Sequence, residues 1–174
     1  SYASLIFISA SGLILLVKII TRILVSEAFY ASWQYVPFLI IATTFSCLAT
    51  FLGSIYFVEK KSNLSLVTTF FGAIVNIILN ILLIPKIGVN GAAIATFLSY
   101  ASVFVLRAFS TKKFVKINWN SNKLFINTVV LLLQSIIIIF ELPYWVLLEI
   151  FLFIIIILLN SKELLLSVKK YFKK

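Results

Sequence analysis

The chain alternates between long apolar runs and short polar breaks. Most runs are roughly 20 residues long, enough to cross about 30 Å of hydrocarbon at about 1.5 Å per residue. Because lipid offers no hydrogen-bond partner to free backbone groups, each run is expected to be a helix. We therefore expect an all-α, polytopic membrane helix bundle of about six spans: Tyr2 to Val25, Tyr35 to Val58, Leu64 to Ile84, Gly91 to Phe109, Leu124 to Leu142 and Tyr144 to Leu159.

The borders of these runs carry further signals. Lys18 and Arg22 interrupt the end of the first run, and the amphipathic stretch Glu27–Gln34 precedes the second. Pro143 stops the fifth helix, and aromatic residues beside it, such as Trp145, are typical of the headgroup level. The last two runs are thus expected to form a hairpin, with a re-entrant pair as the alternative.

The basic residues fall mainly on one side of the predicted membrane. Lys86 is the only one on the other side, or one of three if Lys18 and Arg22 are counted there. Since basic loops stay in the cytoplasm, we expect a multi-pass protein of the bacterial inner membrane, with its C-terminus cytoplasmic. The twelve residues on the cytoplasmic side are Lys60, Lys61, Arg107, Lys112, Lys113, Lys116, Lys123, Lys162, Lys169, Lys170, Lys173 and Lys174.

Composition supports a membrane protein. The chain is 63% hydrophobic and 11% charged, whereas soluble domains are about 45–50% apolar and about 25% charged. The net charge of +10 does not indicate nucleic acid, because the basic residues sit at the ends of apolar runs rather than on one polar face. Membrane lipids are therefore the expected partners of these charges.

Enzyme chemistry has little to work with in this chain. There is no His and no Asp, one cysteine (Cys47) lies inside an apolar run, and no phosphate-binding or dinucleotide motif is present. We accordingly expect no catalytic residues, no metal and no cofactor. The five acidic residues lie at or near predicted helix ends: Glu27, Glu59, Glu141, Glu149 and Glu163.

Polar residues inside apolar runs are the candidates for a substrate path, since each is costly in hydrocarbon. Lys18 and Arg22 share one helix face, and they either face an anionic lipid-linked substrate or extend to the outer headgroups. Asn76 and Asn80 share another face, where they either bind a sugar or join helices. Gln134, alone in its run, favours a bond between helices.

The third and fourth runs are joined by a short turn rich in small residues. Pro85 is expected to end one helix, with Gly88 and Gly91 forming the turn. A small-residue face then follows, which favours close contact between helices. Its members are Ala92, Ala93, Ala95 and Thr96.

Three segments of the chain resemble polysaccharide flippases of the Wzx type. They are residues 31–39, 51–61 and 76–96, the last containing Asn76, Asn80, Pro85, Gly88 and Gly91. They occur in the family's order, and the resemblance covers roughly residues 20–110. The last two runs match only in hydropathy and position.

The resemblance implies a place in the multidrug/oligosaccharidyl-lipid/polysaccharide exporter superfamily, with a MATE/MurJ-like transporter fold. The chain would be its C-terminal lobe, since it opens at Ser1 without any Met. It would work with an upstream N-terminal lobe to flip undecaprenyl-pyrophosphate-linked oligosaccharides. The expected segments are 1–110 with four spans, a basic loop at 111–123, two spans at 124–160, and a basic tail at 161–174 that is either an amphipathic helix or a frayed end.

Other functions remain open at this point. A MATE-type multidrug or cation antiporter would need an acid within the membrane, and no run carries one near its middle. A lipid II flippase and a structural membrane subunit are further alternatives. A membrane-bound biosynthetic enzyme would need Asp- or His-based motifs in a polar loop, which the chain lacks.

Overall fold

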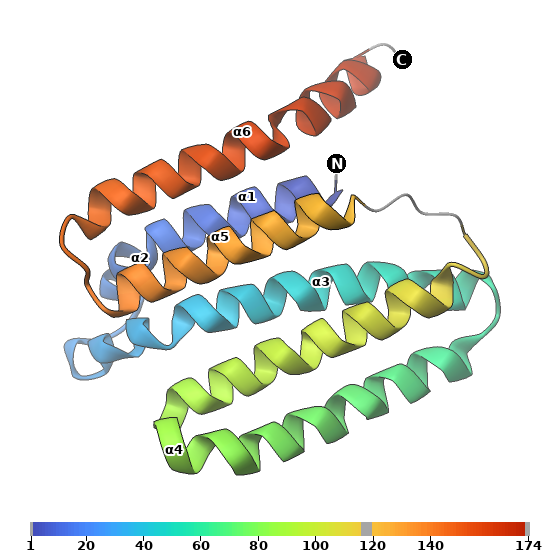
Figure 1. Cartoon of the computed structure of the whole chain (residues 1–174), viewed down its shortest axis with the longest axis horizontal. Helices are drawn as coiled ribbons and strands as arrows, with labels where there is room; N and C mark the ends of the chain where they lie inside the picture. Colours follow the sequence, from blue (N-terminus) through green and yellow to red (C-terminus); the bar gives the residue numbers. More distant parts are fainter. Residues whose placement is uncertain (1, 116–119, 173–174) are drawn as a thin grey trace. The chain divides into compact units, whose positions relative to one another are not determined.

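The computed structural model describes the backbone of residues 2–115 and 120–172, and the side chains of these residues as far as 165 (Figure 1). Within these residues the chain is entirely helical, which confirms the expected all-α class. The elements are α1 (Tyr2–Leu15), α2 (Val17–Leu24), the 3-10 helix η1 (Glu27–Gln34), α3 (Val36–Val58), α4 (Ser62–Thr111), α5 (Ser121–Ile139) and α6 (Trp145–Phe172).

Several of the described helices are long and apolar enough to cross a membrane. Four pass this test singly, namely α3, α4, α5 and the part of α6 as far as Leu165. The pair α1 and α2 makes a fifth if it counts as one span. Because α4 is counted once but contains a break, the six predicted runs correspond to these four helices and the bent pair.

The first run differs from the single helix that we expected. It is divided at Leu16 into α1 and α2, whose axes are bent by 68°. The α1 part is apolar around its whole circumference, whereas α2 mixes Lys18, Thr21 and Arg22 with apolar residues. A helix with charged and apolar positions favours a boundary over the interior of the hydrocarbon, which accounts for the change of direction.

The long helix α4 is a hairpin of two arms, as Figure 1 shows. Its break falls at Ile87 (φ −132°, ψ 16°) and Gly88 (φ 58°, ψ −137°), two residues beyond Pro85. The positive φ of Gly88 is a conformation that residues with a Cβ rarely adopt. The turn therefore depends on glycine at this position.

A second hairpin joins α5 to α6 through residues 140–144. Glu141 (φ 46°) and Tyr144 (φ 61°) both adopt left-handed backbone conformations there, which makes the reversal tight. The backbone of α6 then continues as one helix to Phe172, so the segment from Ser161 onward begins inside α6. The side chains beyond 165 lie outside the described residues.

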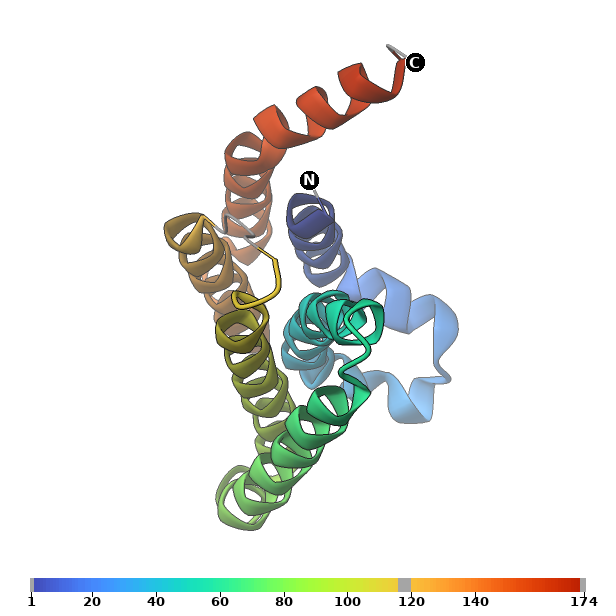
Figure 2. The same ribbon diagram turned by 90° about the vertical axis from the view of Figure 1, so that its right-hand side faces the viewer.

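The helices form two compact units. The first combines Ser1–Pro37 with Asn120–Lys174, and the second is Phe38–Trp119. In the first unit, α1, α5 and α6 pack against one another, as the views in Figures 1 and 2 show. In the second, Phe45 of α3 makes edge-to-face contacts with Phe97 and Phe104 of α4, at ring-centroid distances of 5.5 and 5.7 Å.

Candidate functional site

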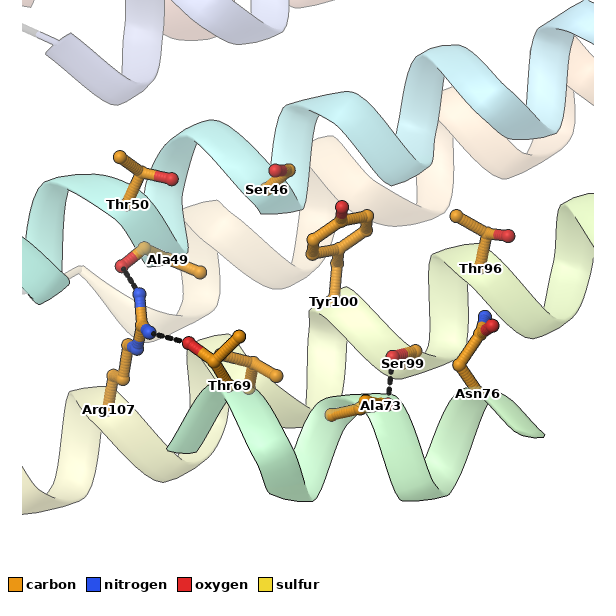
Figure 3. A pocket seen from close by; sticks show the side chains of 12 residues that line it. Ser46, Ala49, Thr50, Thr69, Ala73, Asn76, Thr96, Ser99, Tyr100 and Arg107 are labelled. Carbon is orange, nitrogen blue, oxygen red and sulfur yellow. Dashed lines mark hydrogen bonds between the residues drawn. The ribbon is translucent and has the colours of Figure 1, made fainter. Parts of the chain in front are cut away.

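A polar cavity of about 440 Å³ lies in the second unit, between α3 and the two arms of α4 (Figure 3). Its lining is rich in hydroxyl and amide groups, which is unusual for helices as apolar as these. All three helical segments contribute polar side chains to it. These residues are Ser46, Thr50, Asn76, Thr96, Tyr100 and Arg107.

Arg107 is the only charged residue of the cavity lining, and it is 7% exposed. Its Nε donates to Thr68 Oγ1 at 2.9 Å, and its Nη1 donates to the carbonyl oxygen of Ala49 at 2.8 Å. Its Nη2 donates to Thr69 Oγ1 at 2.9 Å and to the carbonyl oxygen of Ser65 at 3.3 Å. The guanidinium thereby joins the second arm of α4 to the first arm and to α3.

Every acceptor of these hydrogen bonds is neutral. No carboxylate pairs with Arg107 within the part of the chain that the structure describes, and Glu59 is the one acidic residue of the second unit. The four bonds also leave one of the five guanidinium N–H donors for a further acceptor. A buried cation that is hydrogen-bonded but not neutralised favours an anion beside it, and guanidinium groups suit phosphate oxygens particularly well.

Two glycines make room for this arrangement. A Cβ at Gly53 of α3 would lie 2.6 Å from Nη1 of Arg107, so a larger residue would displace the guanidinium. A Cβ at Gly72 would lie 2.3 Å from Cγ2 of Val103. Ser99 Oγ donates to the carbonyl oxygen of Gly72 at 2.6 Å, which holds the two arms of α4 together at this point.

Two of the predicted path residues, Asn76 and Asn80, lie on the first arm of α4. Asn76 lines the cavity, and its Oδ1 accepts a hydrogen bond from Asn80 Nδ2 at 2.9 Å. This bond runs along one helix, so it does not join two helices. Of the pair, Asn76 is therefore the residue that could meet a ligand in the cavity.

Lys18, the third predicted path residue, is neutralised by its surroundings. Its Nζ forms an ion pair with Glu141, and its side chain is 16% exposed. The same Nζ lies 4.3 Å from the ring centroid of Trp33 and 4.2 Å from that of Trp145. These contacts resemble those of an anchoring residue at the edge of a membrane more than those of a free cationic site.

Arg22 lies apart from these contacts. It is exposed, and it lines a separate cavity of about 470 Å³ together with Glu27 and Tyr30. Although Lys18 and Arg22 follow one another by one helical turn, their side chains therefore serve different surroundings. The expected single cationic patch is not formed in this conformation.

The predicted small-residue turn brings the two arms of α4 close together. A Cβ at Gly91 would lie 2.6 Å from the carbonyl carbon and oxygen of Leu83 on the other arm. Ala93 and Ala95 are buried, while Ala92 is half-buried and its carbonyl oxygen accepts a hydrogen bond from Thr96 Oγ1 at 2.8 Å. Thr96 also lines the cavity, so it belongs both to the packing face and to the candidate site.

Two buried charged residues escaped the sequence analysis. Arg107 was counted only as a cytoplasmic cation, and Glu149 only as an acid near a helix end. A local signal for either is weak, because the partners of Arg107 lie 38 to 58 residues away in the chain. Across the residues that the structure describes, no three Cys, Asp or Glu side chains gather in a way that could hold a metal ion.

Comparison with known proteins adds no relative. The chain matches no protein-family model, no curated protein and no solved structure. The geometry and chemistry of the cavity are therefore the basis for a functional proposal.

Proposed function

We propose that this chain is the C-terminal portion of a transporter that flips undecaprenyl-pyrophosphate-linked oligosaccharides across the bacterial inner membrane. The observation that supports the proposal most is the buried Arg107, which has only neutral partners and lines a cavity of hydroxyl and amide groups. The resemblance of residues 31–39, 51–61 and 76–96 to Wzx-type flippases points to the same class of substrate.

The cavity suits an anionic headgroup that carries sugars. Moving a pyrophosphate through hydrocarbon without a counter-charge is very costly, so a flippase must offer positive charge along the route. Arg107 supplies such a charge, while Thr50, Asn76 and Thr96 can exchange hydrogen bonds with sugar hydroxyls. In the orientation that the basic residues favour, Arg107 lies about 6 Å from the cytoplasmic end of its helix, where the substrate is made.

The two outer cations have unequal parts in this proposal. Lys18 is paired with Glu141, so its charge becomes available to substrate only when that pair opens. Arg22 is exposed and can receive a headgroup as it leaves the cavity. Arg22 is therefore the better candidate for the outer end of the route.

The alternatives fit the cavity less well or share its chemistry. A multidrug or cation antiporter would place an acid in its binding cavity, whereas no residue lining this one is acidic and Arg107 would repel a cationic drug. A lipid II flippase would use the same pyrophosphate chemistry. The two flippase activities are separated by which lipid-linked glycan accumulates when transport stops.

The test replaces Arg107 in the complete transporter at matched membrane abundance. We expect Arg107→Gln to lower surface polysaccharide about tenfold or more, because charge-assisted hydrogen bonds contribute about 1.5–3 kcal/mol. Arg107→Lys should retain part of the activity. The lipid-linked precursor should accumulate in the inner leaflet of the Arg107→Gln cells, and its glycan identifies the substrate.

Lys112→Gln is the matched control. It removes a positive charge five residues further along the same end of α4, where Lys112 is exposed above the ring of Phe109 at 5.0 Å. This variant should keep wild-type polysaccharide. Equal polysaccharide in Arg107→Gln and wild type would refute the proposed role of the cavity.

A further inference from the structure

A chain of three buried polar side chains crosses the first unit. Ser11 Oγ of α1 donates a hydrogen bond to Gln134 Oε1 of α5 at 2.7 Å. Gln134 Nε2 then donates to Glu149 Oε2 of α6 at 2.9 Å. All three side chains have no solvent exposure, so a carboxyl group is enclosed where three apolar helices meet.

The carboxyl group of Glu149 is only half satisfied. Its Oε2 accepts the hydrogen bond from Gln134, but its Oε1 is buried and has no hydrogen-bond partner. Neither Gln134 nor Ser11 carries a charge, so the contacts to Glu149 are all neutral. A negative charge at this position would therefore be without compensation.

The other charged groups on the packed helices lie far from Glu149 and neutralise one another. By helical rise, Lys123 is roughly 16 Å from Gln134 along α5, and the charges at the far end of α6 are roughly 20 Å from Glu149. At the opposite end, Lys18 pairs with Glu141. The described titratable groups on α1, α2, α5, α6 and the turn between α5 and α6 are Tyr2, Lys18, Arg22, Lys123, Glu141, Tyr144, Lys162 and Glu163, and Lys123 pairs with Glu163.

A proton is the ligand that resolves this arrangement. An unpaired carboxylate is very costly in an apolar interior, and binding one proton removes its charge. We propose that Ser11, Gln134 and Glu149 form a proton-binding site, in which the carboxyl group of Glu149 takes up one proton from water and releases it again. Ser11 and Gln134 act as positioning residues, because they hold Oε2 and leave Oε1 to carry the proton.

The location of the site indicates the side from which the proton comes. Glu149 lies about 6 Å from the start of α6, one turn after Trp145 and on the same helix face. Trp145 is one of the two rings against which Lys18 rests, beside its partner Glu141. Opening of this end of the unit connects Glu149 with the outer solution, in the orientation that the basic residues favour.

Infrared spectroscopy of the complete protein in lipid bilayers tests proton binding directly. A protonated carboxylic acid has a carbonyl band that carboxylates lack. We expect a band of this kind whose intensity changes with pH in the wild type, is missing in Glu149→Gln and is retained in Glu141→Gln. Gln134→Leu should shift the band, because it removes the hydrogen bond to Oε2.

Two results would overturn the proton site. One is a pH-dependent band that persists unchanged in Glu149→Gln, since the proton would then belong to another acid. The other is a Glu149 band that does not respond to pH at all, which would make the residue a permanently protonated structural acid.

A role of this site in driving transport rests on the proposed function. In vesicles containing the complete transporter, an inward proton gradient should accelerate glycan flipping in the wild type and in Glu141→Gln, and this acceleration should disappear in Glu149→Gln. Equal acceleration in Glu149→Gln would overturn the coupling role. Absence of flipping in the wild type would contradict the proposed function, while the infrared result would stand on its own.

Discussion

The two units join their helices by different polar contacts. In the first unit, side chains meet side chains at successive levels, including Lys18 with Glu141 and Lys123 with Glu163. Asn127 and Asn160 bond to each other through both amides, at 3.0 and 3.3 Å. In the second unit, the contacts run mainly from side chains to backbone carbonyls and hydroxyls, and they are gathered around one buried cation.

This difference separates structural polar groups from groups that can act on a ligand. Charges that are paired, as in Lys18 with Glu141, are satisfied and leave little capacity for a partner. Arg107 and Glu149 are the two buried charged residues without an oppositely charged partner among the described residues. The first favours an anion and the second favours a proton, which is why each carries a functional proposal.

The largest effect expected from a single substitution concerns the close approach of backbone in the second unit. Gly91→Ala should destabilise the protein by about 3 kcal/mol, because its Cβ would meet the backbone of Leu83 at 2.6 Å. The measurement is thermal unfolding in detergent together with the yield of folded protein from membranes. Gly91→Leu, with a larger side chain, should lower that yield further.

Gly12→Ala is the matched control in the first unit. Its Cβ would lie 3.5 Å from the Phe153 ring, an ordinary contact, and alanine is the better helix former. We expect unchanged or slightly higher stability. Similar losses in Gly12→Ala and Gly91→Ala would show that the two units do not differ in how closely their backbones approach.

An intermediate effect is expected when one member of the buried chain in the first unit is removed. Gln134→Leu leaves Ser11 and Glu149 without their shared partner, and it should cost about 2 kcal/mol. The double variant Gln134→Leu with Glu149→Leu should recover much of this loss, because no buried carboxyl group remains. Chemical denaturation of the three proteins measures both changes.

Ser99→Ala supplies the comparison in the second unit. It removes the bond from Ser99 Oγ to the carbonyl oxygen of Gly72, and we expect a loss of about 0.6 kcal/mol, typical of a single bond between membrane helices. A loss in Ser99→Ala as large as that in Gln134→Leu would contradict the distinction between the two kinds of contact.

The smallest effect is expected at the partly exposed ion pair. Lys18→Gln should change the free energy of unfolding by about 0.5 kcal/mol, because the carboxyl group of Glu141 is well exposed and gains water in place of the cation. A double-mutant cycle with Glu141→Gln measures the pair. In polysaccharide assays at matched abundance, Arg22→Gln should reduce transport more than Lys18→Gln, and the reverse order would assign the route to Lys18.

The sequence by itself determined the features that depend on local physics. Apolar runs of spanning length predict helices, since backbone groups in an apolar setting must bond within the segment. Glycine at position 88 and proline at position 143 mark the two hairpins, where the backbone reverses within a few residues. These signals lie within one or two helical turns of the feature that they predict, so they could be read directly.

The tertiary structure decided everything that depends on distant parts of the chain. The break at Leu16 and the grouping of α1 with α5 and α6 follow from packing between segments more than 100 residues apart. In the same way, Gln134 became a partner of Ser11 across 123 residues, and Arg107 a partner of Ala49 across 58. Whether a polar residue in an apolar helix is paired, exposed or uncompensated depends on which neighbours face it, and only the folded arrangement of the helices establishes that.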